Sequence, residues 1–274
     1  MRLSLCNEVI RELPFPAQCD FAAGLGYDAL EIAPFTLVED PREMTPGQVA
    51  EVRSALSNAG IVCSSLHWLL VSPDGLSLTS EDPEIHARTT DVMRRLCDLA
   101  GELGAEVLVH GSPKQRLLAE GREEAGRAQA LACFRAAAEA AQGANVIYCA
   151  EPLAPRETNF INTVDEAAAL VRDIGSPAFR TMVDCSATLA MGDDPADLLD
   201  AHLPGGLIAH VQVNDANRRG PGEGDYRFAP VFETLKRHGY TGWIAAEPFV
   251  YVPDGPACAA RTIGYLQGVM EGVA

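Results

Sequence analysis

The fold is decided by four short apolar runs in the second half of the chain: VIYCAE (146–151), FRTMVD (179–184), LIAHVQV (207–213) and WIAAE (243–247). Their length and their content of apolar, often β-branched residues are typical of buried β-strands. Three of the runs end in a carboxylate, and the other carries His210 and Gln212. An ionised carboxylate is costly to bury unless something pairs it. These strand ends therefore predict a shared counter-charge, and a divalent cation is the simplest one.

Outward from these runs, the same alternation of short apolar segments and longer helical patterns covers the whole chain. The expected strands are 3–6, 29–33, 61–67, 107–110, 146–151, 179–184, 207–213 and 243–247. The expected helices lie near 16–25, 46–59, 83–103, 120–142, 163–174, 195–202, 229–238 and 256–270. Three helices carry start signals, namely Thr45-Pro46, Asp82-Pro83, and Thr163 with Glu166.

Eight βα units predict an α/β fold with a closed parallel sheet, a (β/α)8 barrel. An open doubly wound sheet is the rival, but no GxGxxG motif follows the first strand. No Pro/Gly/Ser-rich linker divides the sequence, so we expect a single domain over residues 1–274. In such barrels the active site lies at the C-terminal ends of the strands.

The bulk composition excludes several classes of function. A net charge of −17 argues against nucleic acid or an anionic membrane as a partner. No signal peptide opens the chain, and no apolar stretch is long enough to span a bilayer. The eight cysteines form no CxxC pair, which disfavours a zinc knuckle or a thioredoxin-like motif. We therefore expect a reduced cytoplasmic protein.

The barrel gathers the polar strand ends at one mouth. From the third strand to the eighth they are His67, His110, Glu151, Asp184, His210 with Gln212, and Glu247. Three converging carboxylates repel one another, and oxygen-rich ligation favours Mg²⁺ or Mn²⁺ over zinc. His210 and Gln212 are two residues apart, so both should face the barrel interior, while residues 209, 211 and 213 face the helices. Either side chain could be the fourth ligand.

This constellation fits carbon-acid chemistry. A cation with two open positions can chelate the adjacent carbonyl and hydroxyl oxygens of a sugar-like substrate. Chelation acidifies the neighbouring C–H bond and stabilises an enediolate. Glu151 and Glu247 lie on well-separated strands and could flank that carbon as base and acid.

Several segments together resemble the sugar phosphate isomerase/epimerase superfamily, the xylose isomerase-like TIM barrels. The resemblance is closest to the D-tagatose/D-psicose 3-epimerases and the hydroxypyruvate isomerases, and it covers nearly the whole chain. The segments that carry it are LSLTSEDP (76–83), GSPKQR (111–116), EPLAPRE (151–157) with NFINT (159–163), HVQVNDANR (210–218) with PGEGD (221–225), and EPF (247–249).

The resemblance implies a metal site at Glu151, Asp184, Gln212 and Glu247, with both glutamates also serving as the acid/base pair. Mn²⁺ or Mg²⁺ is the expected ion, with Co²⁺ as an alternative. The 3-epimerases carry His at the third ligand position and the hydroxypyruvate isomerases carry Gln, which favours Gln212 as the ligand and gives His210 a supporting place beside the substrate.

The resemblance also implies substrate contacts. Glu157 and Arg218 match a substrate-binding glutamate and arginine of the epimerases. The epimerases have a substrate-binding His three residues after the metal Asp, and here that position is Ala187. This departure, with Gln212, argues against a free ketohexose as the substrate.

Three further side chains are interpreted from their places at strand ends. His67 and Trp68 are candidates for a sugar-binding wall, because an aromatic face packs against C–H surfaces. His110 is a third candidate for substrate contact.

The leading hypothesis is a divalent-metal-dependent isomerase or epimerase of a small ketose or related carbohydrate, assembled as a homodimer or homotetramer as in the families it resembles. The alternative is a metal-dependent lyase on the same site, an inosose-type dehydratase or a C-glycoside-cleaving enzyme. A DNA-repair endonuclease would need more histidines and a basic face. A barrel that only binds a metabolite or a partner is the non-enzymatic reading.

Overall fold

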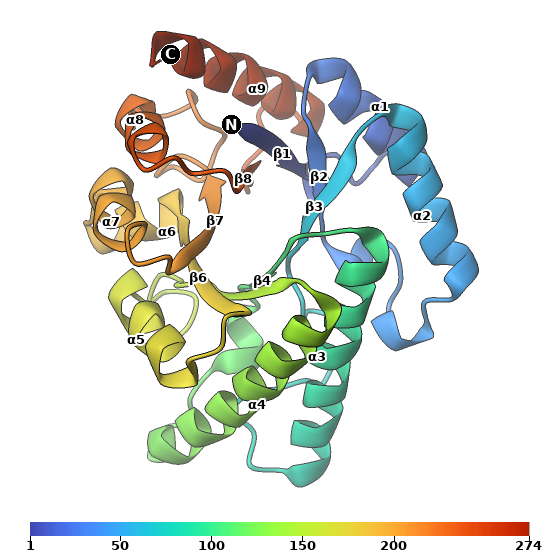
Figure 1. The fold of residues 1–274 in the computed structure, drawn as a ribbon, viewed down its shortest axis with the longest axis vertical. Helices are drawn as coiled ribbons and strands as arrows, with labels where there is room; N and C mark the ends of the chain where they lie inside the picture. Colours follow the sequence, from blue (N-terminus) through green and yellow to red (C-terminus); the bar gives the residue numbers. More distant parts are fainter. Residues whose placement is uncertain (274) are drawn as a thin grey trace.

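Eight parallel strands close into a barrel in the computed structural model, which describes residues 1–273. Each strand pairs with its sequence neighbours, and β1 also pairs with β8, which completes the ring (Figure 1). The strands are β1 (Arg2–Cys6), β2 (Ala29–Ile32), β3 (Val62–Leu66), β4 (Val107–His110), β5 (Ile147–Ala150), β6 (Phe179–Asp184), β7 (Ile208–Val213) and β8 (Trp243–Ala246). The predicted (β/α)8 barrel is confirmed.

Helices surround the barrel on the outside (Figure 1). They are α1 (Phe15–Leu25), α2 (Pro46–Ala59), α3 (Pro83–Leu103), α4 (Glu123–Ala144), α5 (Val164–Ile174), α6 (Cys185–Met191), α7 (Pro195–His202), α8 (Ala229–Arg237) and α9 (Gly255–Gly272). The long helices α3 and α4 pack along each other and extend beyond the barrel (Figure 1). Short 3-10 turns add η1 (Asn7–Ile10), η2 (Pro34–Thr36), η3 (Pro41–Glu43) and η4 (Pro113–Arg116).

All three helix start signals are confirmed by side-chain caps. Thr45 forms a capping box with Gln48, the Asp82 carboxylate accepts hydrogen bonds from the first turn of α3, and the Thr163 hydroxyl accepts one from the backbone of Glu166. The expected start of α4 at residue 120 is three residues early, because Gly121 has φ +74° and so cannot continue a right-handed helix.

Helix α6 is the one α-helix that the sequence analysis missed within residues 1–273. It begins directly after β6, with Asp184 as its N-cap and no intervening loop. Seven residues are too few to carry a clear helical period, so the pattern gave no signal.

Most of the core lies between the strands and the helices, and its largest fully buried apolar side chains include Phe134, Tyr148, Phe179, Phe228 and Phe232. A separate small cluster fills part of the barrel interior and is formed by alternate residues of neighbouring strands: Val107, Val109, Cys149 and Met182, with Ile147 and Ala209 packed against them.

Ala209 was expected to face the helices, and this detail is wrong. The pairing of β6 with β7 shifts register between Thr181 and Met182, which brings Ala209 into the interior cluster. Val211 and Val213 join the outer core as expected.

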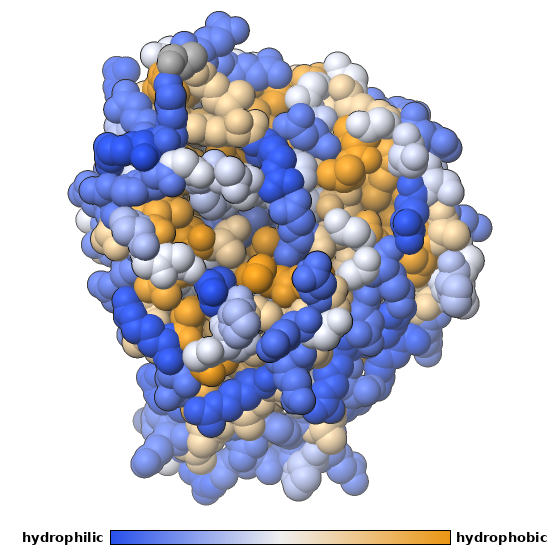
Figure 2. All heavy atoms as spheres, in the orientation of Figure 1, coloured by the Kyte–Doolittle hydropathy of each residue, from blue (hydrophilic) through white to orange (hydrophobic). Residues whose placement is uncertain are grey.

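Figure 2 shows one face of the molecule, where hydrophilic residues predominate and hydrophobic residues gather near the middle and toward the upper right. All eight cysteines are buried free thiols. Within residues 1–273, no helix combines the length and the apolar character that crossing a membrane requires.

Candidate active site

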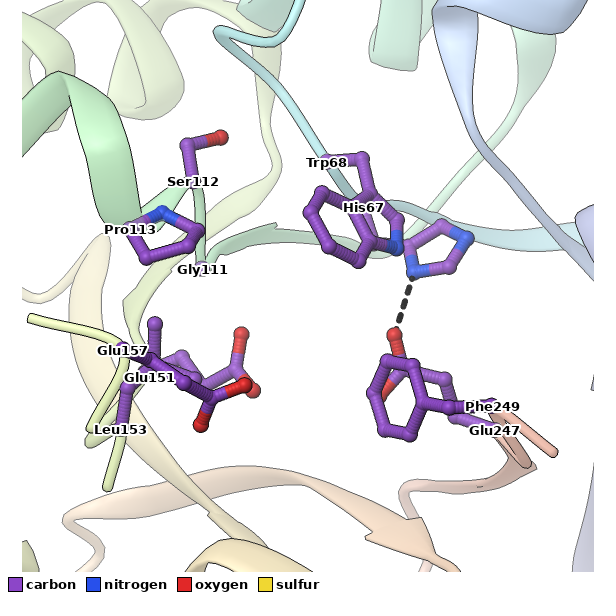
Figure 3. Close-up of a pocket in the computed structure, with 10 residues that line it drawn as sticks. All are labelled: His67, Trp68, Gly111, Ser112, Pro113, Glu151, Leu153, Glu157, Glu247 and Phe249. Carbon is purple, nitrogen blue, oxygen red and sulfur yellow. Dashed lines mark hydrogen bonds and ion pairs between the residues drawn. The ribbon is translucent and has the colours of Figure 1, made fainter. Parts of the chain in front are cut away.

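A cavity opens at the C-terminal ends of the strands, where the sequence analysis placed the active site. Its lining comes from segments that follow β3, β4, β5 and β8 (Figure 3). The lining residues are His67, Trp68, Gly111, Ser112, Pro113, Glu151, Leu153, Glu157, Glu247 and Phe249.

Three of the predicted carboxylates come together here, and two of them, Glu151 and Glu247, line the cavity. Glu151 and Glu247 come directly after β5 and β8, and Asp184 ends β6. One carboxylate oxygen of each lies within 4.8 Å of the others, and all three side chains are buried. Glu151 and Glu247 project from opposite sides of the cavity (Figure 3).

The closeness of these groups changes their acidity. Burial, together with the charges of Glu247 and Asp184, raises the pKa of Glu151 well above its ordinary value. Burial also raises the pKa of Asp184 to about 6 and that of Glu247 to about 8. Without an added cation, the cluster therefore retains protons that ordinary carboxylates lose.

Glu151 is held from the side of β4. A Cβ atom at Gly111 would collide with Oε2 of Glu151, so the carboxylate lies directly against that glycine. The fully buried guanidinium of Arg116 donates from Nη1 to the backbone carbonyl of Glu151 at 2.7 Å. Arg116 was quoted in the sequence only as part of a family-like segment, and its buried charge could not be read from there.

Asp184 is fixed by its neighbours in α6 and β7. Its Oδ1 accepts hydrogen bonds from the backbone N–H of Ala187 at 2.6 Å and from the Ser186 hydroxyl at 3.1 Å. Asn214 donates from Nδ2 to Oδ2 of Asp184 at 2.7 Å and to the carbonyl of Glu247 at 3.0 Å. Sequence reasoning did not select Asn214, although its place two residues after Gln212 puts both on the same side of the strand.

Glu247 and a second acidic residue, Glu8, both contact His67. The Nδ1 atom of His67 lies 3.1 Å from Oε1 of Glu247, and its Nε2 atom lies 3.0 Å from Oε2 of Glu8 (Figure 3 shows the first contact). Burial disfavours the imidazolium, but the charges of Glu8 and Glu31 outweigh it and raise the pKa of His67 well above its usual value. Glu8, in η1, was not predicted.

The other two predicted groups, Gln212 and His210, point inward from β7 but do not line the cavity. Both contact Glu31 of β2, which is fully buried and was also not predicted. Gln212 donates from Nε2 to Oε1 of Glu31 at 2.5 Å, and Nε2 of His210 lies 2.6 Å from Oε2. Burial would raise the pKa of Glu31, but the charges of His210 and His67 reverse this and lower it.

The residues present fit a divalent cation. Oε1 of Gln212 and Oε2 of Glu247 are buried without a hydrogen-bond partner, and an unpaired buried acceptor is costly. Together with Glu151 and Asp184 they offer a donor set made of oxygen atoms, which suits a hard cation such as Mg²⁺ or Mn²⁺.

The rim of the cavity carries aromatic rings and one ion pair. Trp68 packs edge-on against Phe249, with ring centroids 6.5 Å apart. The Arg218 guanidinium lies 4.4 Å from the centre of the Phe249 ring, and its Nη2 is 3.8 Å from Oε1 of Glu157. The structure thus brings Glu157, Arg218 and Trp68 to the same rim.

His110 is a predicted substrate contact that the structure turns away from the barrel interior. Its Nδ1 lies 2.6 Å from the Tyr148 hydroxyl, and its ring packs edge-on against Phe134 of α4. Val107 and Val109 occupy the barrel interior, so strand alternation turns His110 toward the helices. Burial lowers the pKa of His110 to about 3, which keeps it neutral.

Comparisons with known proteins agree with this architecture. A family described as "Xylose isomerase-like TIM barrel" matches residues 19–268. The chain is 27% identical over 237 residues to the D-psicose 3-epimerase of Enterocloster bolteae, which covers 84% of this chain and 75% of the relative. It is 28% identical over 283 residues to a putative hydroxypyruvate isomerase of Streptomyces coelicolor, covering 91% of this chain and 94% of the relative.

Among solved structures, a D-psicose 3-epimerase crystallised in the presence of D-fructose superposes with a TM-score of 0.84. The match covers 98% of this chain and 99% of that one, at 19% identity. At that identity the likeness is one of fold.

Proposed function

Because the chain belongs to the xylose isomerase-like TIM barrel family, we propose that it is a divalent-metal-dependent isomerase or epimerase of a small ketose or a related carbohydrate. The observation that carries this proposal is the pair of buried glutamates, Glu151 and Glu247, on opposite sides of one cavity with Asp184 between their strands. Relatives named as epimerases and isomerases identify the chain as an isomerase or epimerase.

The cation, preferably Mn²⁺ or Mg²⁺, would be held by Glu151, Asp184, Glu247 and Gln212. When bound, such an ion supplies Lewis acidity to neighbouring carbonyl and hydroxyl oxygens of the substrate. Asn214 keeps Asp184 and the backbone of Glu247 in fixed positions through its two hydrogen bonds.

Glu151 and Glu247 would move the proton. One glutamate removes the hydrogen from the carbon next to the substrate carbonyl, which leaves an enediolate, and a glutamate returns a proton to it. A carboxylate can take up this proton as a general base and give it back as a general acid. Groups on both faces permit epimerisation, whereas aldose–ketose isomerisation needs only one face.

The rim would select the substrate. Glu157 and Arg218 offer hydrogen bonds to hydroxyl groups, and the rings of Trp68 and Phe249 offer an apolar surface for sugar C–H groups. Ala187 presents no polar side chain beside Asp184, which supports a substrate other than a free ketohexose.

Three further expectations stay predictions: assembly as a homo-oligomer, a single domain over residues 1–274, and a cytoplasmic location.

The test is a panel of ketoses, hydroxypyruvate and inososes incubated with the protein in D₂O and Mn²⁺ or Mg²⁺, followed by NMR. The proposal expects deuterium at one carbon of one substrate, only with metal, and without loss of water or an aglycone. Release of water or an aglycone would replace the isomerase by the lyase alternative. Absence of exchange on every compound would overturn the proposal.

A further inference from the structure

Glu31 is a completely buried carboxylate whose role the reaction above does not explain. It is the third residue of β2 and lies across the barrel from β7. A charged side chain in such a place is retained only with strong partners. The side chains that contact Glu31 therefore indicate its role.

Donors surround Glu31. Its Oε1 accepts from Nε2 of Gln212 at 2.5 Å and from the Cys6 thiol at 3.3 Å. Its Oε2 accepts from the Ser65 hydroxyl and lies 2.6 Å from Nε2 of His210. An ionised carboxylate has no hydrogen to give, so every neighbour must present a hydrogen to it.

Because Glu31 can only accept hydrogen bonds, it fixes the orientation of the Gln212 amide. A glutamine side chain has a donor branch and an acceptor branch on the same carbon, so turning one toward Glu31 turns the other away. The nitrogen must face Glu31, and Oε1 is then the atom left buried without a partner. Gln212 is paired in register with Asp184, a member of the carboxylate cluster, so the two residues are neighbours across β6 and β7.

We propose that Glu31 is a positioning residue that orients the amide of Gln212, so that Oε1 faces the site of Glu151, Asp184 and Glu247 as a cation ligand. The ligand part of this inference rests on the proposed function. Carboxylates behind metal ligands act in this way in general, since they fix the orientation of the ligand and strengthen it as a donor.

A replacement for Gln212 must both donate a hydrogen bond to Glu31 and present an acceptor atom on its other side. An imidazole can donate one N–H to Glu31 and present its other nitrogen as an acceptor, so Gln212→His keeps both functions. Gln212→Leu keeps neither. Glu31→Gln keeps the size of the side chain but can donate as well as accept, so it no longer dictates the orientation of residue 212.

The first measurement is NMR of the metal-free protein, with the Gln212 side-chain amide assigned by its loss in Gln212→Leu. We expect its N–H signal to be shifted and protected from exchange as in a hydrogen bond to a carboxylate, and to lose both features in Glu31→Gln. Cys6→Ala, which removes a different donor from the same carboxylate, is the matched control and should leave the signal in place.

The second measurement is Mn²⁺ affinity by calorimetry. Glu31→Gln should weaken binding by about 10- to 100-fold, whereas Gln212→His and Cys6→Ala should bind close to the parent. An unchanged amide signal and an unchanged affinity in folded Glu31→Gln would overturn the inference. If the parent binds no Mn²⁺, the proposed function fails in its metal requirement, and the amide signal still decides the orientation.

Discussion

The carboxylates at the mouth and Glu31 are buried in the same barrel, but their pKa values are shifted in opposite directions. At the mouth, Glu151, Asp184 and Glu247 crowd together, and burial raises the pKa of each. Deeper inside, Glu31 is at least as buried, yet the charges of His210 and His67 and its hydrogen bonds lower its pKa. Burial is common to both groups, so the difference comes from their partners.

The mouth carboxylates and Glu31 therefore have different tasks. Glu31 is satisfied by the chain itself and serves as a fixed support. At the mouth, the contacts from the chain do not offset burial and mutual repulsion, and Oε2 of Glu247 has no hydrogen-bond partner, which leaves room for a cation.

The largest effect is expected from Glu151→Gln, which removes a mouth carboxylate that we assign to proton transfer. Turnover should fall by about 10²- to 10⁴-fold, the usual contribution of a general acid or base. Steady-state kinetics on the substrate found by deuterium exchange provides the measurement. Glu139→Gln, at an exposed position of α4, is the control and should retain activity. Full activity in Glu151→Gln would remove Glu151 from the mechanism.

Gly111→Ala should have the next largest effect. The added methyl group collides with the Glu151 carboxylate and must displace it. Misplacing a reacting group by about 1 Å can cost about 10²-fold in rate. Turnover of Gly111→Ala should therefore fall to that extent, while Gly143→Ala, in α4 with open space around the new Cβ, should be neutral. Equal activities of the two variants would mean that Glu151 need not lie against Gly111.

Stability should separate the two groups by sign. In the metal-free protein at pH 8, Glu31→Gln should destabilise the fold by about 3–5 kcal/mol, because it removes a buried charge whose partners are arranged around it. Glu151→Gln should leave stability unchanged or raise it, because burial and the nearby carboxylates already disfavour the charged form of Glu151. Chemical denaturation measures both. A loss of the same size in both variants would contradict the distinction.

A dependence of stability on pH is also expected. The pKa of Glu247 is raised from 4.5 to about 8 and that of Asp184 from 3.8 to about 6. The folded state therefore binds more protons than the unfolded state between these limits. Their stabilising contribution is complete below about pH 4 and is lost as the pH rises to about 8. Melting temperatures of the chelator-treated protein should show this decline, and saturating Mn²⁺ should remove it.

The sequence was sufficient for the barrel and for the three mouth carboxylates. Each carboxylate follows an apolar run, and in a parallel barrel all such ends meet at one mouth. The sequence also favoured Gln212 over His210 as a ligand. This choice stays a prediction, and it is supported by the Oε1 atom of Gln212, which has no hydrogen-bond partner.

What the sequence did not reveal depends on register and on distant partners. Glu31 stands inside the run ALEI, and its contacts come from β1, β3 and β7, far away in the chain. His110 also ends a strand, but the alternation along β4 turns it toward α4, and the sequence alone did not fix which face it takes.

The most direct test of the central claim is the number of protons released when the cation binds. Titration of Mn²⁺ into the metal-free protein, by calorimetry at pH 7 in buffers of different ionisation enthalpy, measures both binding and proton release. Binding of one ion per chain with release of protons is predicted, because the mouth carboxylates must lose protons to become ligands. Glu151→Gln should release fewer protons. Binding without proton release, or no binding, would contradict the assignment of the mouth as a cation site.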